Sequence, residues 1–251
     1  MIEIKNVSYA IGGAKILQDI NTVIPKGSVT ALIGPNGAGK SSLLNLIGRI
    51  EPLQTGTIDV DGQNVTTSHS GRLARTMAFL GQHTAVASRL RVSELVAFGR
   101  WPHCHGRPGP EDHEKVADAI AQFSLRGLAD RFLDELSGGQ AQRAHLAMTF
   151  AQDTPWVLLD EPLNNLDMAH SRILMRKLSD LRDAGKSVVI VVHDLNQAAA
   201  WADHLVAMKH GRVVVSGAPD EVLTPDWLSA LYDTEVQVLR YADRPLVLSH
   251  V

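Results

Sequence analysis

Cysteine is almost absent from this chain, since Cys104 is the only one in 251 residues. A single thiol excludes an intramolecular disulfide, a CxxC redox pair and an iron–sulfur cluster held by cysteines, and it fits a reducing compartment. Long hydrophobic runs are also absent. A membrane-spanning helix needs roughly 18 or more apolar residues in a row, and the densest apolar run here is residues 188–192. The sequence therefore predicts no segment that crosses a bilayer.

An excess of positive charge is missing as well. There are 24 Lys and Arg against 27 Asp and Glu, which gives a formal net charge of −3. This balance argues against a nucleic-acid binder that relies on a broad basic surface. The N-terminus includes an early acid, Glu3, and no apolar signal region, so we expect no secretory signal and a soluble, cytoplasmic protein. Work at a membrane would then require a partner that holds the chain there.

The chain does have the composition of a globular protein, with 45% hydrophobic and 20% charged residues. Apolar and polar residues alternate in the first 30 positions, and again at 57–62 before an Asp-Gly turn, which predicts a small antiparallel sheet. Continuous apolar runs predict the buried strands of a parallel sheet covered by helices, an α/β fold. These runs lie at residues 29–33, 77–80, 157–159 and 187–192.

Between about 85 and 151 the sequence shows no strong strand pattern. Helical patterns at 92–99 and 111–123 predict a helical insertion there. The segment 100–110 between them holds three prolines and two glycines, so we expect an irregular loop. From residue 235 the sequence alternates again, which predicts a terminal hairpin around Asp243.

A glycine-rich loop follows the first buried run and fits the pattern G-x-x-x-x-G-K-[ST]. Glycines let successive backbone N–H groups point inward around an anion, and the helix expected at 42–47 adds positive charge at its N-terminus. Lys40 would then reach the β- and γ-phosphates of a nucleotide, and the Ser41 hydroxyl would bind Mg²⁺. The alternative is a chance glycine-rich turn, which the setting between a strand and a helix disfavours. The loop residues are Gly34, Pro35, Asn36, Gly37, Ala38, Gly39, Lys40 and Ser41.

Two carboxylates, Asp160 and Glu161, end another apolar strand. Ligands bind at the carboxyl ends of strands in open α/β sheets, so we expect these acids to face the nucleotide. Because strand side chains alternate in direction, Asp160 would hold Mg²⁺ while Glu161 would be free to polarise the attacking water. The alternative is a solvated acidic turn before Pro162.

The five residues 136–140, Leu-Ser-Gly-Gly-Gln, open another helix. Ser137 and Gln140 have the spacing of a capping box, which predicts a helix through about Ala151. This second helix N-terminus suited to phosphate lies 140 − 40 = 100 residues after Lys40. One chain cannot easily bring both to the same γ-phosphate. A symmetric dimer can, if each ATP lies between the loop of one chain and residues 137–140 of the other.

With these motifs in this order, the chain resembles the ATP-binding subunit of an ABC transporter over nearly its whole length. The resemblance implies an ABC ATPase nucleotide-binding domain, a P-loop NTPase (RecA-like) α/β fold whose parallel sheet carries an antiparallel β subdomain and an inserted helical subdomain. It implies a single domain over residues 1–251. The core with its N-terminal β subdomain would take about 1–84 and 152–230, the helical subdomain about 85–151, and a C-terminal tail about 231–251.

The resemblance also assigns functional roles. The family's Walker A loop runs on to Ser42, and Tyr9 stands where an aromatic ring stacks on adenine; packing beneath the small sheet is the alternative for Tyr9. Glu161 is the catalytic glutamate. Gln82 and His193 match the Q-loop glutamine and the H-loop histidine that complete the catalytic group, and a satisfied core histidine is the alternative for His193.

The cofactors that the resemblance implies are ATP and Mg²⁺, with Mg²⁺ held by Ser41, Gln82 and Asp160. In the dimer, the signature and the D-loop of the second chain bind ATP. The family's usual D-loop, Ser-Ala-Leu-Asp, is here Asn-Asn-Leu-Asp, so its aspartate is retained. These signature and D-loop residues are Ser137, Gly138, Gly139, Gln140 and Asp167.

Three consecutive residues, His103, Cys104 and His105, have the composition of a metal cluster. Adjacent residues rarely point at one ion, and no second ligand group follows at a usable spacing. We therefore interpret this segment as a flexible loop.

The segments 96–102, 130–131 and 162–171 are similar to bacterial iron–siderophore importers, a group that also includes haem and cobalamin importers. The resemblance implies a homodimer with two integral membrane permease subunits, served indirectly by an extracytoplasmic substrate-binding protein. It implies no nucleic-acid partner and a peripheral position on the cytoplasmic side of the bacterial inner membrane. Two other classes remain open: a soluble ABC ATPase acting on nucleic acid or ribosomes, and an interaction protein for cofactor assembly.

The resemblance finally places Gln82 and the segment 83–100 at the wall of a groove that receives a permease helix. Apolar residues of this segment would supply affinity, and Arg89 and Arg91 would bind the carbonyls at the end of that helix.

Overall fold

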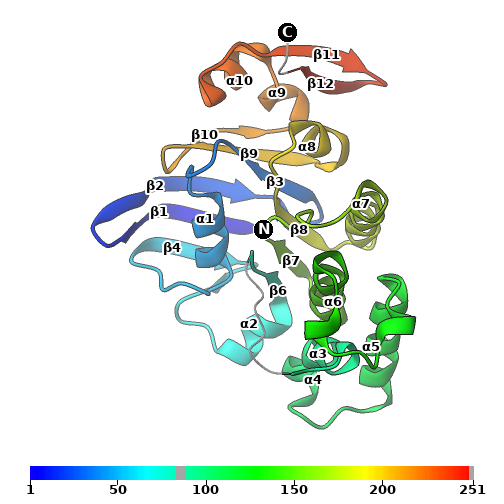
Figure 1. The fold of residues 1–251 in the computed structure, drawn as a ribbon. Helices are drawn as coiled ribbons and strands as arrows, with labels where there is room; N and C mark the ends of the chain where they lie inside the picture. The colour runs from blue at the N-terminus through cyan, green and yellow to red at the C-terminus, as the bar shows by residue number, and fades with distance from the viewer. Residues whose placement is uncertain (83–88, 249–251) are drawn as a thin grey trace. The chain divides into compact units, whose positions relative to one another are not determined.

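The computed structural model describes residues 1–82 and 89–248, and the chain divides into two compact units (Figure 1). The first unit combines both ends of the chain, Met1–Ser68 and Lys177–Val251, and the second unit is the continuous segment His69–Arg176. The predicted helical subdomain, about 85–151, lies inside the second unit, which also contains two strands.

An antiparallel sheet forms the N-terminal part of the first unit, with the strand order β2-β1-β4-β5. Along β1, Ile2, Ile4 and Val7 are buried while residues between them are not. This alternation fits a sheet with one face on the core and the other in solvent, and it confirms the predicted small antiparallel sheet. The strands are β1 (Ile2–Ile11), β2 (Ala14–Ile24), β4 (Thr55–Val60) and β5 (Gln63–Asn64).

Four further strands of the first unit follow the order β10-β9-β3-β8. Strand β3 is parallel to both β8 and β9, and β10 is antiparallel to β9. Every residue of β3 and β8 is buried, as the continuous apolar runs predict. Because β3 and β8 are parallel, their carboxyl ends lie at the same edge of the sheet. The strands are β3 (Val29–Ile33), β8 (Ser187–Val191), β9 (His204–Lys209) and β10 (Arg212–Gly217).

The first unit also contains the helix after β3 and the C-terminal elements. The two terminal strands pair in register from Gln237 with Leu248 to Tyr241 with Arg244, which confirms the predicted hairpin. Ala242 and Asp243 between them both have positive φ, as a tight two-residue hairpin turn requires. These elements are α1 (Lys40–Ile47), α8 (Leu195–Trp201), α9 (Pro219–Val222), α10 (Pro225–Tyr232), β11 (Gln237–Tyr241) and β12 (Arg244–Leu248).

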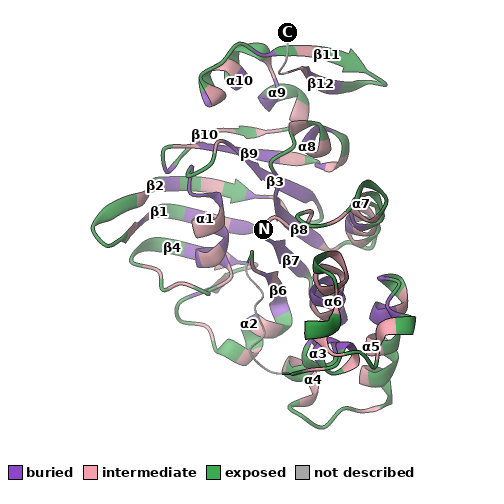
Figure 2. Cartoon of the chain, viewed as in Figure 1, coloured by how far each residue is buried: buried purple, intermediate pink, exposed green. Residues whose placement is uncertain are grey.

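Two parallel strands and several helices form the second unit. Figure 2 shows β6 and β7 as buried along most of their length. Helices α3 and α5 pack against α6, and the rings of Phe123 and Phe150 meet edge to face at 4.9 Å. The elements are α2 (Ser70–Thr76), β6 (Met77–Leu80), α3 (Val92–Phe98), α4 (Trp101–Cys104), α5 (Pro110–Gln122), 3₁₀ turns at Arg126–Leu128 and Leu133–Glu135, α6 (Gly138–Ala151), β7 (Trp156–Leu159) and α7 (Met168–Asp183), whose last residues belong to the first unit.

Helices α3 and α5 confirm the two predicted helices of the insertion, but the segment 100–110 is not wholly irregular. It contains α4, whose second residue is Pro102. Proline is tolerated in the first turn of a helix, where its missing N–H would have no intrahelical partner. Among the described helices, none combines the length and the hydropathy that crossing a membrane requires.

Candidate nucleotide site

The phosphate loop connects β3 to α1 in the first unit. Its glycines Gly34, Gly37 and Gly39 have φ values of 139°, 78° and 96°, a conformation that residues with a Cβ rarely adopt. At Gly39 a Cβ would also lie only 2.6 Å from Cδ2 of Leu17. Glycine is therefore needed both for the backbone conformation and for space. Such a sequence of conformations turns backbone N–H groups toward one bound anion.

Lys40 begins α1 and its side chain is buried, with 5% exposed. Its Nζ donates to the carbonyl oxygens of Gly34 at 2.7 Å and Pro35 at 3.0 Å. The ammonium group is therefore fixed over the loop, beside the N-terminus of α1. A fixed positive charge together with the N-terminus of a helix suits the phosphates of a nucleotide. Ser41 and Ser42 follow in the first turn of α1 and are half-buried.

His193 lies just beyond β8, at the sheet edge where β3 enters the phosphate loop. The next residue, Asp194, caps α8, because its carboxylate accepts from the backbone N–H groups of Asn196 at 2.8 Å and Gln197 at 3.3 Å. This cap fixes the turn that carries His193. His193 itself is exposed, so the alternative of a core histidine does not describe it.

Tyr9 is the one predicted binding residue of the first unit whose surroundings do not fit its predicted role. Only 6% of the residue is exposed, and its Oη donates to Oε2 of Glu51 at 3.1 Å. Burial, and then the neighbouring carboxylate, raises the pKa of Tyr9. A ring stacks on adenine only if one of its faces is free, so the alternative of packing beneath the small sheet describes Tyr9.

In the second unit, Asp160 and Glu161 follow β7 in very different surroundings. Asp160 is 3% exposed, and its backbone N–H donates to the carbonyl of Leu80 at 2.9 Å, which continues the pairing of β7 with β6. Glu161 has a φ of 48°, in the left-handed region. For a residue with a Cβ this conformation costs on the order of 1 kcal/mol, and it is maintained only where surrounding contacts fix it.

Two amides hold the Glu161 carboxylate. Gln82 Nε2 donates to its Oε2 at 2.9 Å, and Asn164 Nδ2 donates to the same oxygen at 2.7 Å. Hydrogen bonds to the charged form of a carboxylate stabilise it and fix its orientation. The structure thus brings Gln82, predicted from resemblance alone, to the predicted catalytic carboxylate. Asn164 begins the Asn-Asn-Leu-Asp of the D-loop, but it was not predicted as a residue of this site.

The signature residues begin α6 as the capping box predicts. The Ser137 Oγ accepts from the backbone N–H of Gln140 at 3.4 Å, and the Gln140 Oε1 accepts from the N–H of Ser137 at 2.9 Å. Gly139 meets the D-loop so closely that a Cβ there would lie 2.8 Å from the carbonyl oxygen of Asn165. Glycine at this position therefore lets the D-loop lie directly against the start of α6.

Asp167 of the D-loop precedes α7 and is bound to the first turn of that helix. Its Oδ1 accepts from the backbone N–H of His170 and contacts the His170 Nδ1, both at 2.8 Å. These two hydrogen bonds lower the pKa of Asp167, the one from the backbone most. A polar cavity of about 310 Å³ lies between the signature and the D-loop, lined by Ser137, Gly139, Gln140, Arg143, Asn165, Leu166, Asp167 and His170.

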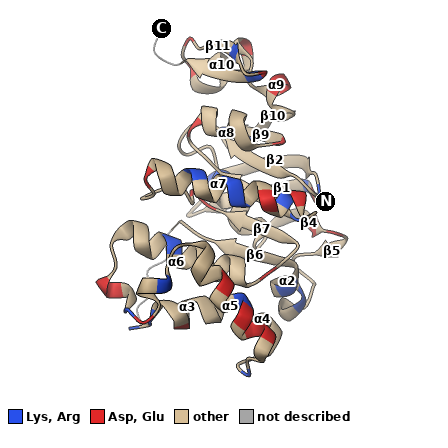
Figure 3. Cartoon of the chain, turned by 90° about the vertical axis from the view of Figure 1, so that its right-hand side faces the viewer, with Lys and Arg blue, Asp and Glu red and all other residues tan. Residues whose placement is uncertain are grey.

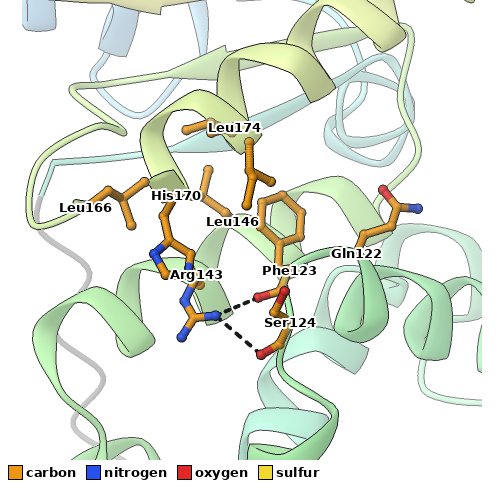
Figure 4. Close-up of a pocket in the computed structure, with 9 residues that line it drawn as sticks. Gln122, Phe123, Ser124, Arg143, Leu146, Leu166, His170 and Leu174 are labelled. Atoms are coloured by element: carbon orange, nitrogen blue, oxygen red, sulfur yellow. Dashed lines mark hydrogen bonds between the residues drawn. The ribbon is translucent and has the colours of Figure 1, made fainter. Parts of the chain in front are cut away.

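Arg143 and His170 line this cavity but were not predicted. Figure 4 shows the Arg143 guanidinium pointing at the end of α5, where Nη1 donates to the carbonyls of Phe123 at 3.0 Å and Ser124 at 3.3 Å. Arg143 therefore fixes α6 to α5. Its position three residues after Gln140, on the same side of α6, is the sequence signal that would have pointed to it.

The residues His103, Cys104 and His105 lie in and just after α4 rather than in a loop. A ring nitrogen of His103 is 2.8 Å from the carbonyl oxygen of Gln152. Over residues 1–82 and 89–248, no group of three or more His, Cys, Asp or Glu side chains is arranged to hold a metal ion without other ligands.

The predicted site residues thus form one group in each unit. The group of the first unit, at the carboxyl ends of β3 and β8, consists of Gly34, Pro35, Asn36, Gly37, Ala38, Gly39, Lys40, Ser41, Ser42 and His193. The group of the second unit consists of Gln82, Ser137, Gly138, Gly139, Gln140, Asp160, Glu161 and Asp167.

The chain is similar to known proteins of one family. The chain matches the family described as ABC transporter over residues 17–164. It is 43% identical over 239 residues to the petrobactin import ATP-binding protein YclP of Bacillus subtilis (strain 168), an alignment that covers 95% of both proteins. It is 38% identical over 228 residues to the hemin import ATP-binding protein HmuV of Streptomyces coelicolor, which covers 91% of this chain and 81% of the relative.

The fold also has solved counterparts. One is the dimeric structure of an ATP-binding cassette in a post-hydrolysis state, bound to ADP and Pi. It is 27% identical, with a TM-score of 0.79, and the match covers 87% of this chain and 98% of that one.

Proposed function

The chain belongs to the ABC transporter family of ATP-hydrolysing subunits, and from this premise we propose that it powers the import of ferric siderophores through a membrane permease. The observation that carries the proposal is the 43% identity, over 95% of both chains, to a petrobactin import subunit. Haem import is the second candidate, supported by the hemin relative at lower identity and lower coverage.

In this function, the group of the first unit binds the nucleotide, and Glu161 with Gln82 in the second unit acts on water. The loop N–H groups and Lys40 would bind the phosphates of ATP. Glu161, held by Gln82 and Asn164, would orient the attacking water and take its proton. His193, exposed at the sheet edge, would contact the terminal phosphate.

We propose Mg²⁺ as the second cofactor, with Ser41, Gln82 and Asp160 as the residues that would hold it. A carboxylate that is only 3% exposed, at the carboxyl end of a strand, fits a cation that compensates its charge. Bound Mg²⁺ would neutralise charge on the phosphate oxygens.

We also propose that two copies form each site. In each chain the capped start of α6, with Ser137 exposed beside the polar cavity, would bind the ATP held by the phosphate loop of the other copy. Mixing a Lys40→Ala chain with a Ser137→Arg chain tests this arrangement. Each variant alone should be inactive, and the mixture should recover at most one competent site per dimer. Normal hydrolysis by either variant as a strict monomer would contradict the dimer.

The permease is proposed to dock on the second unit, where α3, α4 and α5 surround a largely apolar cavity of about 490 Å³. Phe98 and Trp101 line it and are 50% and 55% exposed. Exposed aromatic rings beside an apolar cavity are typical of a surface that binds another protein. Part of the wall predicted from the sequence, residues 83–88, lies outside the described residues.

The arginines of that wall have other partners. The guanidinium groups of Arg89 and Arg91 lie 4.2 Å and 4.8 Å from the centre of the Phe132 ring, and Arg91 Nη1 donates to the carbonyl of Asp130 at 2.6 Å. Arg91 therefore fixes the start of α3 within the unit. Arg89, whose side chain is 67% exposed, forms ion pairs with Asp134 and Glu135 at 3.9 Å, longer than the 2.6 Å hydrogen bond of Arg91, so it is the arginine proposed to contact the permease.

The complete assembly would contain two copies of this chain on the cytoplasmic face of the inner membrane, two permease subunits and an extracytoplasmic binding protein. A role on nucleic acid or in cofactor assembly is disfavoured by the relatives, which are import subunits. The formal net charge of −3 gives no general attraction for nucleic acid. Figure 3 marks several acidic residues along α5 and both basic and acidic residues along α7.

The test is reconstitution with a candidate permease and binding protein in liposomes. We expect co-purification with the permease, and ATP hydrolysis that rises when the binding protein carries a ferric siderophore. If ATP hydrolysis rises only when the binding protein carries haem, the transported substrate is haem and not a ferric siderophore. If the chain associates with no permease, the import function is refuted. Arg89→Glu should weaken co-purification while leaving the nucleotide affinity of the isolated chain unchanged.

A further inference from the structure

The elements after β10 have no role in the function described so far, and they lie outside the residues that match the ABC transporter family, 17–164. Figure 1 shows α10 and the β11–β12 hairpin together in the first unit, near α8. Residues 225–248, from the start of α10 to the end of β12, are called the C-terminal brace below. Two side chains, Tyr232 and Asn196, connect the brace to the phosphate loop and to the loop that carries His193.

The first connection is from α10 to the phosphate loop. Tyr232, the last residue of α10, lies close enough to the phosphate loop for the backbone N–H of Gly34 to lower the pKa of its hydroxyl. Burial raises the pKa of Tyr232 to about 12, against a smaller lowering by the Gly34 N–H. The phenol is thus neutral at physiological pH, and its hydroxyl lies beside the first N–H of the loop.

Strand β9 also contacts both the start of the phosphate loop and the end of α10. Ile33 pairs with Ala207, so Gly34 lies beside Met208, and a Cβ on Gly34 would collide with the Met208 carbonyl oxygen. The following residue, Lys209, binds the end of α10: its Nζ donates to the carbonyl of Ala230 at 2.5 Å and to Oδ1 of Asp233 at 2.7 Å. The start of the phosphate loop and the end of α10 are thereby fixed to the same strand.

The second connection is from the β11–β12 hairpin to the segment between β8 and α8, residues 192–194, which carries His193 and is called the His193 loop. The side-chain amide of Asn196 pairs with both backbone groups of Val247: Nδ2 donates to the carbonyl at 3.1 Å, and Oδ1 accepts from the N–H at 2.8 Å. Asn196 lies three residues after His193 and is held by the Asp194 cap. Arg244 of the same hairpin donates to the carbonyls of Ala199 and Ala200 at the other end of α8.

The two ends of the brace are connected to each other as well. The backbone N–H of Val236, just before β11, donates to the Ser229 Oγ of α10 at 3.2 Å. The α10 part and the hairpin part of the brace are therefore in direct contact.

From these contacts we propose that the C-terminal brace positions the phosphate loop and the His193 loop relative to each other, with Tyr232 and Asn196 as positioning residues for ATP binding and hydrolysis. The proposal rests on the proposed function, because it takes the phosphate loop as the ATP site.

The first experiment uses the intact chain without any substitution. The sequence has three tyrosines, Tyr9, Tyr232 and Tyr241, so incorporation of 3-fluorotyrosine gives three fluorine NMR resonances. Titration with Mg-ATP should move the Tyr232 resonance and leave that of Tyr241, which is 74% exposed on the hairpin, in place. A Tyr232 resonance that does not respond to bound Mg-ATP would overturn the proposal.

The second experiment separates the two loops. Tyr232→Phe removes only the hydroxyl and should raise the Kd and KM for ATP about three- to tenfold, the effect of one lost hydrogen bond, with kcat within about twofold. Asn196→Ala should instead lower kcat while the Kd for ADP stays unchanged, because the His193 loop would contact only the terminal phosphate. Tyr241→Phe and Gln237→Ala, exposed on the same hairpin, are the matched controls.

The outcomes distinguish this proposal from the one it rests on. If the unsubstituted chain binds no Mg-ATP, and Lys40→Ala changes nothing, the proposed function fails. If the unsubstituted chain binds Mg-ATP, and both Tyr232→Phe and Asn196→Ala match their controls in Kd, KM and kcat, the brace has no positioning role.

Discussion

The two halves of the candidate site differ in what shapes them: backbone geometry in the first unit and side-chain contacts in the second. In the first unit, backbone geometry makes the phosphate loop: three glycines with positive φ and a lysine bonded to the carbonyls of its own loop. In the second unit, side chains make the hydrolytic group, since two amides hold one carboxylate oxygen, Gln82 from 79 residues away and Asn164 from three residues after Glu161. The first half depends on residues adjacent in sequence, and the second also depends on Gln82, which only the fold brings to Glu161.

This difference predicts how each half fails. A loop whose N–H groups share one anion loses binding when its fixed cation is removed. A carboxylate held by two donors loses its chemistry when it is replaced, but binding by the other half should survive. The predictions below test this division from the largest expected effect to the smallest.

Lys40→Ala should have the largest effect. The substitution removes the buried ammonium from the loop, and charged hydrogen bonds to phosphate contribute enough that ATP affinity should fall by roughly 100-fold or more. Equilibrium binding of ATP measures the effect. Lys15→Ala, at an exposed position on β2, is the matched control. Affinity close to that of the unsubstituted chain, in a variant that remains folded, would contradict the role of the loop.

Glu161→Gln should separate binding from hydrolysis. Removing a positioned general base should lower kcat by on the order of 100-fold or more, while ATP still binds and the ATP-bound dimer accumulates. Single-turnover hydrolysis and size-exclusion chromatography with Mg-ATP measure the two effects. Glu235→Gln, exposed and remote in sequence, controls for the loss of one charge. Near-normal turnover would assign the base to another residue.

Gln82→Ala and Asn164→Ala should each have a smaller effect on kcat, about five- to tenfold, because each removes one of two hydrogen bonds to Oε2 of Glu161. The double variant is the sharper measurement. Both amides orient the same oxygen, so their effects should not add, and the coupling in a double-mutant cycle should be well above that of distant sites. Strictly additive losses would show that the two amides act independently.

The same division explains how much the sequence could predict. The phosphate loop, the capping box at Ser137 and the strands β3, β6, β7 and β8 depend on neighbours in the chain, and each was predicted at or close to its observed place. The buried strand β9 (His204–Lys209) was not predicted. The partner that only the fold brings to Glu161 is Gln82, 79 residues away, and it was predicted from the resemblance alone. Asn164 and His170 each lie three residues after the carboxylate that they contact, and they were missed although this spacing is local.

Two further differences have the same cause. The sequence showed arginines at 89 and 91 but not the Phe132 ring that they stack on, because that contact is between segments about 40 residues apart. The short helix α4 formed where prolines and glycines predicted a loop, since Pro102 falls in its first turn and is tolerated there. Local patterns predict elements, while contacts between elements decide which side chains remain available for function.

Tyr9 gives the smallest expected effect on the nucleotide and so the finest test of this distinction. Its place in the sequence predicted stacking on adenine, whereas its surroundings give it a packing role with a hydroxyl bonded to Glu51. Tyr9→Leu keeps an apolar side chain and removes the ring. A ring stacked on a base contributes roughly 1–3 kcal/mol, so a stacking role would weaken ATP binding about fivefold or more. The buried position predicts a change within twofold, together with a loss of about 1–2 kcal/mol in unfolding free energy for the hydroxyl contact and the altered packing. Tyr9→Phe, which keeps the ring and loses only the hydroxyl, separates the two contributions. Weaker ATP binding in Tyr9→Leu but not in Tyr9→Phe, at equal folded fraction, would restore the adenine role and show that the ring becomes accessible when nucleotide binds.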